Sequence, residues 1–239
     1  MRGTRSALAA LVAAGLVVGA LTGCAGDRGG LSQQAVGAAL PDPADIGTGW
    51  TLVGTTTQRP TDAPPSDSVT DAAADEPACH AALVALSAAD QEGSPKRFAR
   101  SVYRDPAATG STADRDLTLT VEAFASPPDV PGLVRAVTQA CTEPLTTAAG
   151  IRKVRMTIEE HRYATAGAAG YTVLYSTDGL RYAYDYVAVA RGEAVVSAST
   201  TGPSAAANAV VLQRAISLAT ARLNAAQGGA APEQSASAR

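Results

Sequence analysis

Two histidines are the first residues to consider for catalysis, because imidazole is the usual general base near neutral pH. His80 directly follows Cys79, and His161 directly follows the glutamates Glu159 and Glu160. A serine hydrolase that used His161 would need a Gly-x-Ser-x-Gly elbow, which the sequence lacks. The sequence also has no His-Glu-x-x-His zinc helix and no phosphate-binding Gly-x-x-x-x-Gly-Lys loop. We therefore expect no catalytic residue, no metal site and no cofactor, and we predict that the protein is not an enzyme.

Cys24 offers a different chemistry because of the residues that precede it. Arg2 and Arg5 come before an apolar run over residues 7–21. A basic start followed by a short apolar stretch and small residues is typical of a secretory signal, and this run is shorter than the ~20 residues that cross a bilayer. The stretch Leu-Thr-Gly-Cys at 21–24 resembles the bacterial lipobox. That resemblance implies that residues 1–23 are a lipoprotein signal peptide and that Cys24 carries fatty acids such as palmitate. It places the protein at the outer face of the cytoplasmic membrane, and the alternative is an ordinary signal peptide.

The two remaining cysteines, Cys79 and Cys141, would lie in an oxidising, exported compartment. Two cysteines in such a compartment most simply form one disulfide. The closed loop of about 62 residues would stabilise the fold by roughly 4 kcal/mol in the chain-entropy description. Two free thiols or a metal-binding pair are the alternatives, although a metal pair would lack a companion His/Cys cluster.

Composition limits the class of partner. The chain has 239 residues and a formal net charge of −3, which becomes about −5 once Arg2 and Arg5 are removed. A mildly acidic chain without a long basic run argues against nucleic-acid binding. Aromatic residues make up only 4%, so that Ala, Val and Leu must form most of the core. An Ala-rich, Lys-poor composition is typical of GC-rich bacteria such as actinobacteria.

Changes in composition along the chain suggest its organisation. We expect a lipidated tether over 24–37, one folded domain over 38–225 and a disordered tail over 226–239. The segment 59–77 is rich in Pro, Asp and Ser and is expected to be an exposed loop. Its acidic residues lack the alternating spacing and the glycine of a calcium loop: Asp67, Asp71 and Asp75.

Hydrophobic periodicity predicts strands and helices within that domain. The expected helices cover 77–89, 130–141 and 205–224. The expected strands cover 51–57, 97–103, 117–125, 152–162, 171–176, 180–191 and 195–200. These elements predict an α+β fold in which a central antiparallel sheet of six or seven strands is packed by about three helices. The proposed disulfide would connect the first two helices.

The dipeptide Asp178-Gly179 is a strong signal for a type I′ hairpin turn. With these two residues in the turn, Tyr175 faces Tyr182 and Tyr171 faces Tyr186. Because side chains alternate along a strand, five tyrosines then share one face of the sheet: Tyr171, Tyr175, Tyr182, Tyr184 and Tyr186. Such a face is either a structural ladder of packed rings or a binding surface, since tyrosine combines apolar area with a polar group.

Several short stretches carry a resemblance to a known family. They are Leu-Pro-Asp-Pro-Ala-Asp at 40–45, Pro-Ala-Cys at 77–79, Phe-Ala-Ser at 124–126 before a helix that ends at Cys141, and Arg-Gly-Glu-Ala-Val-Val at 191–196 before an Ala-rich terminal helix. In these the chain resembles the extracellular sensor domain of the mycobacterial kinase PknH and its lipoprotein relatives. The resemblance implies an antiparallel sheet with helices, a cleft and a ligand-sensing role. That family usually has a second disulfide, which this chain lacks.

These observations predict a membrane-anchored domain that binds a small ligand or an envelope partner without catalysis, and the tyrosine face is the candidate site. A lipid or glycolipid carrier is one alternative, and it would need an enclosed apolar cavity. A cell-envelope enzyme whose residues meet only in the folded protein is another.

Overall fold

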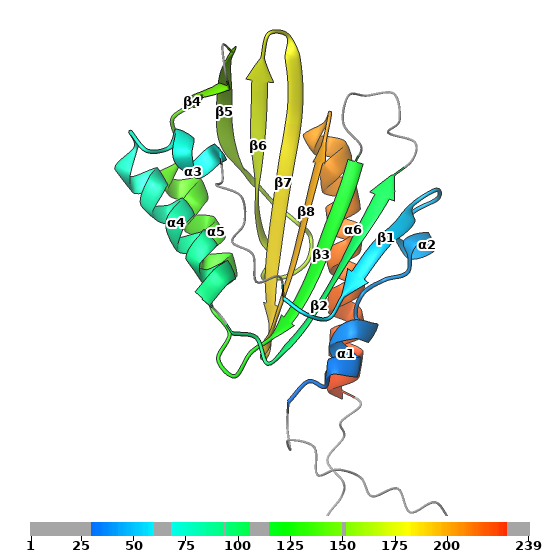
Figure 1. Ribbon diagram of the computed structural model, residues 1–239. Coiled ribbons are helices and arrows are strands. Elements are labelled where there is room, and N and C mark those ends of the chain that lie inside the picture. The colour runs from blue at the N-terminus through cyan, green and yellow to red at the C-terminus, as the bar shows by residue number, and fades with distance from the viewer. Residues whose placement is uncertain (1–29, 60–67, 93, 106–114, 150–151, 229–239) are drawn as a thin grey trace, which may run out of the picture. The chain divides into compact units, whose positions relative to one another are not determined.

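Eight antiparallel strands form a single sheet in the computed structural model, which describes residues 30–59, 68–92, 94–105, 115–149 and 152–228 (Figure 1). The strand order across the sheet is β1-β2-β3-β8-β7-β6-β5-β4. The strands are β1 (Thr51–Thr56), β2 (Arg97–Asp105), β3 (Arg115–Ala123), β4 (Leu145–Ala149), β5 (Arg152–His161), β6 (Ala169–Thr177), β7 (Leu180–Arg191) and β8 (Ala194–Gly202).

Helices cover both faces of this sheet. They are α1 (Gln33–Ala38), α2 (Pro43–Ile46), α3 (Ser68–Ala72), α4 (Pro77–Glu92), α5 (Val130–Ala140) and α6 (Ala205–Gly228). The predicted α+β class is confirmed, and the three long helices α4, α5 and α6 are the three that the periodicity predicted. None of the helices in the described ranges is long and apolar enough to cross a membrane. The proposed signal sequence and Cys24 lie outside the described residues.

The folded part begins earlier in the chain than expected. The sequence prediction placed residues 33–37 in a flexible tether, but Gln33–Ala38 forms α1, and Ser32 accepts a hydrogen bond from the Ala35 amide at its start. Val36 is 0% exposed and packs in the core with Leu212 and Leu223 of α6. One buried valine in a polar, glycine-bearing stretch gives too little periodicity to predict this helix. At the other end of the chain, α6 continues past the expected residue 224 to Gly228.

The segment 59–77 is also more structured than expected. The prediction of an exposed loop is wrong for its second half, because α3 forms there, and Val69 of this helix and Ala73 directly after it are buried. A five-residue helix is too short to show a helical repeat in the sequence.

Strand β4 was not predicted from the sequence either. Its sequence, Leu-Thr-Thr-Ala-Ala, has no alternating large apolar residues. The strand forms because its main chain pairs with β5, a contact that the local sequence does not indicate.

The predicted hairpin register is confirmed. Tyr175 pairs with Tyr182, and Tyr171 pairs with Tyr186. The turn residues Asp178 and Gly179 have φ angles of 42° and 81°, the left-handed values that a type I′ turn requires. The next hairpin sets Tyr186 opposite Ser199. We call the side of the sheet that carries the five tyrosines the tyrosine face and the opposite side the α6 face.

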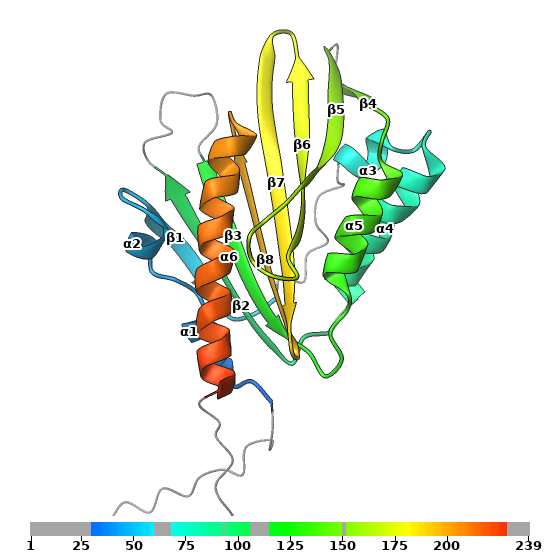
Figure 2. The same cartoon turned by 180° about the vertical axis from the view of Figure 1, so that it is seen from behind.

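The α6 face is covered by α6, with α1 beside it (Figure 2). Its core consists of small and aliphatic side chains from β2, β3, β7 and β8 against Leu212 and Ile216 of α6. Two long-range polar contacts hold the N-terminal segment onto this layer. The Tyr103 hydroxyl donates to the Pro41 carbonyl at 2.7 Å, and Arg222 of α6 pairs with Asp45 at 2.7 Å.

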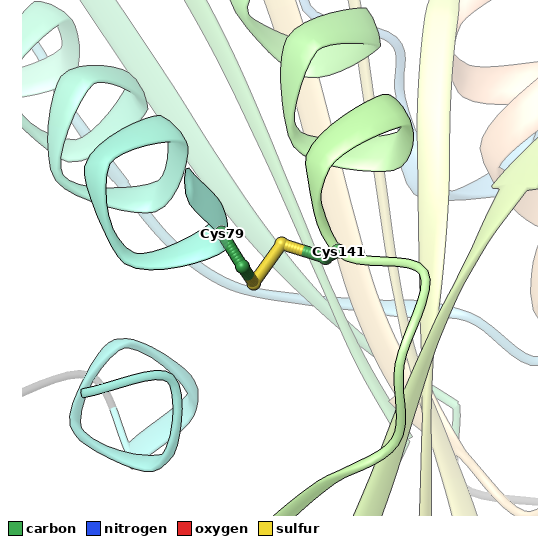
Figure 3. Close-up of a disulfide and its surroundings, with 2 residues drawn as sticks. All are labelled: Cys79 and Cys141. Carbon is green, nitrogen blue, oxygen red and sulfur yellow. A yellow bond between two sulfur atoms is a disulfide. The ribbon is translucent and has the colours of Figure 1, made fainter. Parts of the chain in front are cut away.

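The tyrosine face is covered by α5, which packs on β5, β6 and β7. Val134 and Val137 of α5 are fully buried there against Val173 and Ala188. Helix α4 lies outside α5 and contacts it along its length, so that α4 is separated from the sheet by another helix (Figure 1). The predicted disulfide between Cys79 and Cys141 joins the start of α4 to the end of α5 (Figure 3). It is a covalent cross-link, additional to the main chain, between this outer helix and α5.

Removing the disulfide should therefore loosen α4 before it affects the sheet. We expect the Cys79→Ser/Cys141→Ser variant to lose about 4 kcal/mol of unfolding free energy in urea denaturation, because the disulfide closes a loop of 62 residues. Amide hydrogen exchange should rise most within 77–92 and least in β3 and β8. Unchanged stability, or faster exchange that is uniform over the sheet, would contradict this description.

Candidate functional site

The row of tyrosines is buried at one end. Tyr171 is buried beneath the α5 layer, with its ring 5.5 Å from the Tyr186 ring and 6.4 Å from the Tyr184 ring, centroid to centroid. Tyr184 and Tyr186 are half-buried and pack against the same core cluster as Val134. At this end the rings are part of the packing between the sheet and α5.

The other end of the row is exposed. Tyr175 and Tyr182 stack almost parallel, with 4.4 Å between ring centroids and 5° between ring planes. Tyr182 is 39% exposed and Leu180, beside the turn, is 51% exposed. This part of the β6–β7 hairpin extends past α5 and past the N-terminal end of α6 (Figures 1 and 2). Tyr175 is half-buried and packs against the same core cluster as Tyr184 and Tyr186, so that Tyr182 is the exposed member of the stacked pair. Its ring, held by the ring of Tyr175, presents a flat apolar surface with a hydroxyl group at its edge.

A buried polar cluster lies on the α6 face, directly behind these tyrosines. Asp185 of β7 is 0% exposed and accepts hydrogen bonds from the Thr172 hydroxyl and, at 2.8 Å, from the Asn208 side-chain amide. The same Asn208 nitrogen also donates to the Ala183 carbonyl at 3.2 Å. Asn208 lies so close to the end of β8 that a Cβ on Gly202 would be 2.4 Å from its side-chain oxygen. The cluster thus connects β6, β7 and the first turns of α6.

Burial raises the pKa of Asp185, while the hydrogen bonds from Thr172 and Asn208 and the nearby His161 act in the opposite direction. No cationic side chain in the described ranges forms an ion pair with this carboxyl. Burial also raises the pKa of Tyr163, whose hydroxyl is buried and faces the charge of Asp185. Because Asp185 has no exposed surface, it cannot contact a substrate, and we assign it a structural role.

The sequence reasoning missed this cluster. The signal in the sequence was a charged residue, Asp185, at a position of β7 whose side chain points to the α6 face, as those of Ala183 and Val187 do. His161 packs against Tyr163, with 4.8 Å between ring centroids and a tilt of 54° between ring planes. Its neighbours Glu160 and Arg162 form a long, exposed ion pair at 3.8 Å. His80 lies in the first turn of α4, next to the disulfide. Within the described ranges, no three His, Cys, Asp or Glu side chains are placed to share a metal ion.

Two of the hollows on the surface of the described part of the domain are large enough for a small ligand. One, of about 360 Å³, lies beside α1 at the start of β2 and is lined by Arg59, Lys96 and Arg97. Arg59 also pairs with the buried Glu122 at 3.5 Å. The other, of about 440 Å³, lies on the α6 face between β5, β6, β7 and the start of α6. A third exposed feature is the edge strand β1, where Leu52 and Val53 face solvent next to an irregular pairing.

Comparison with known proteins identifies the fold. The extracellular domain of PknH from Mycobacterium tuberculosis superposes with a TM-score of 0.51 at 10% sequence identity, covering 84% of this chain and 100% of that domain. At this identity the likeness shows a shared fold. No protein-family model and no curated protein sequence matches the chain.

The Asp185 cluster predicts a specific dependence of stability on pH. Above its raised pKa, Asp185 is ionised in a site that disfavours the charge. As the pH falls through that pKa, the folded protein binds a proton more readily than the unfolded chain, in which an aspartate has a pKa of about 3.9. The folded state therefore gains stability.

Replacing Asp185 by asparagine removes this titration. The quantity to follow is the difference in unfolding free energy between the wild type and Asp185→Asn. We expect this difference, wild type minus variant, to increase as the pH falls from neutral and to level off below about 3.9. Urea denaturation of both proteins at several pH values measures the difference. The exposed Asp75→Asn serves as the control and should show little of this dependence. A constant difference for Asp185→Asn, or one that shrinks on acidification, would contradict the assigned burial.

Proposed function

We propose that the protein is a lipid-anchored extracytoplasmic domain that binds an envelope partner without catalysis. Its binding surface is the exposed end of the tyrosine row. The observation that carries the proposal is the stacked pair Tyr175 and Tyr182 at the end of the hairpin, in which the half-buried ring of Tyr175 supports the 39% exposed ring of Tyr182. Rigid, half-exposed aromatic rings are the side chains most enriched at the energetic centres of binding surfaces.

The position of this pair within the domain also supports the proposal. The described chain begins beside the β7–β8 turn, where the Leu31 amide bonds to Glu193. The Asp178–Gly179 turn is at the other end of β7, twelve residues away, or about 40 Å in an extended strand. A chain anchored at its N-terminus thus enters the domain at one end of the sheet, and the exposed tyrosines lie at the other.

Three independent features support an extracytoplasmic, anchored location. The stretch 21–24 resembles a lipobox. The pairing of Cys79 with Cys141 is a bond that persists in oxidising compartments. The chain also shares its fold with the extracellular domain of PknH. The short sequence stretches that resemble the PknH family imply a sensor role for this domain. A carrier of lipid or glycolipid would need a closed apolar chamber, whereas the two surface hollows described above are open and lined partly by arginine.

The anchor can be tested by a single substitution. We expect the wild-type chain, expressed in a bacterium with a lipoprotein-processing pathway, to sediment with membranes and to resist extraction by high salt. The Cys24→Ala variant should move to the soluble exported fraction, because the thiol that would carry the lipid is gone. Cell fractionation and immunoblotting measure this. Equal membrane retention of both proteins would contradict lipidation at Cys24.

The binding surface can be tested by photo-crosslinking in the host. We expect p-benzoylphenylalanine in place of Tyr182 to give a discrete crosslinked product, because that position would face the partner. The same photoreactive residue in place of Val210, which is 70% exposed on α6, is the matched control. If crosslinking followed exposure alone, position 210 would react more than position 182, which is only 39% exposed.

A second substitution separates binding from folding. Tyr175→Ala should remove the stacked neighbour and weaken the crosslink at position 182. It should lower the unfolding free energy by about 2 kcal/mol, because the variant loses a cross-strand aromatic pair and a half-buried ring. Absence of any product at position 182, or equal products at 182 and 210, would contradict the proposed surface.

A further inference from the structure

The hollow of about 440 Å³ on the α6 face is built from two rows of cross-strand neighbours. In the row nearer the hairpin turn, Ser176 of β6 pairs with Arg155 of β5 on one side and with Arg181 of β7 on the other. In the adjacent row, Leu174 of β6 pairs with Ala183 of β7. Its volume lies within the range of about 300–1,000 Å³ that is usual for small-molecule sites.

The hollow is separate from the proposed tyrosine surface. Side chains alternate along a strand, so that Leu174 and Ser176 point away from the face that Tyr175 occupies. Tyr175 and Tyr182 also line the hollow, although the alternation directs their side chains to the other side of the sheet. The two surfaces therefore lie on opposite sides of the same hairpin.

Two positive charges face the hollow without a balancing acid. Arg155 and Arg181 are exposed, and neither forms a hydrogen bond or an ion pair with any residue in the described ranges. No aspartate or glutamate is among the described residues that line the hollow. Three other arginines of the domain behave differently, because each has a carboxylate partner: Arg104 with Asp116, Arg115 with Asp105 and Arg222 with Asp45.

The spacing of the two arginines suits one anionic group. Cross-strand neighbours have Cβ atoms about 5 Å apart, which places the Cβ atoms of Arg155 and Arg181 about 10 Å apart with Ser176 between them. Both long side chains can therefore reach an anion above Ser176. Guanidinium groups bind carboxylate and phosphate oxygens with paired hydrogen bonds, and the serine hydroxyl adds a further donor.

The rest of the hollow is apolar. Leu174 is half-buried, Ala183 is 1% exposed, and Pro203 forms the side next to α6. Ala205 also lines it, at the first turn of a 24-residue helix whose dipole favours negative charge. A ligand that fits all of these groups has an anionic head and an apolar body.

We propose that this hollow binds a small organic anion, with its carboxylate or phosphate group held between Arg155 and Arg181 above Ser176 and its apolar part against Leu174 and Pro203. The site needs neither the tyrosine rings nor the lipid anchor, and it stands even if the tyrosine surface has no partner.

The test uses phenyl phosphate and benzoate as probes, with inorganic phosphate and the neutral benzyl alcohol for comparison. Each is titrated into the ¹⁵N-labelled, purified full-length protein, and amide chemical shifts are followed. We expect at least one of the two aromatic anions to give saturable shifts at Ser176 and Ala183. It should bind more tightly than inorganic phosphate, because of its apolar part, and more tightly than benzyl alcohol, because of its charge.

Substitution of the arginines provides the control for charge. We expect the Arg155→Gln/Arg181→Gln variant to bind that anion about tenfold more weakly or worse, since it loses two charge-assisted hydrogen bonds. The Arg162→Gln/Arg214→Gln variant changes the net charge equally at two exposed positions away from the hollow and should bind as the wild type does. No saturable shift with either aromatic anion, equal binding of benzyl alcohol, or equal loss in both double variants would overturn the proposal.

Discussion

The register of the β6–β7 hairpin is the constraint on which the rest of the structure depends. The turn at Asp178 and Gly179 has positive φ angles at both residues, which matches the twist of the two strands and determines which residues face each other. A shift of one residue would move every side chain of one strand to the other face. The same turn therefore places the tyrosines on one side and Asp185 with Arg181 on the other.

The covered middle and the uncovered end of this hairpin have different roles. Near the middle of the sheet, Tyr171 packs beneath α5 and Asp185 lies beneath α6, so that both faces are closed there. Towards the turn, both helices end and the strands continue (Figures 1 and 2). Two neighbours in sequence on this uncovered part, Tyr182 on one face and Arg181 on the other, are available to contact another molecule. The covered part supplies the rigidity that such a surface needs.

Much of this arrangement could be predicted from the sequence, because it depends on local patterns. The alternation in 180–191, the Asp178-Gly179 turn and the two cysteines each carry a short-range signal, and the sheet, the register and the disulfide followed from them. What could not be predicted depends on contacts between distant segments. Val36 and Val69 are single apolar residues in polar stretches, and only their burial against remote helices makes α1 and α3 evident. The hydrogen bond from Asn208 to Asp185, and the placement of Arg155 and Arg181 on either side of Ser176, likewise depend on residues more than twenty positions apart.

The central claim is that the uncovered end of the β6–β7 hairpin is where this domain binds. Hydrogen–deuterium exchange of the purified protein, with and without the detergent-solubilised envelope of its host, tests that claim directly. We predict that the envelope extract slows exchange within 174–184 and leaves the exposed edge strand β1 unchanged. Slower exchange confined to β1, or no change anywhere in the sheet, would contradict the account.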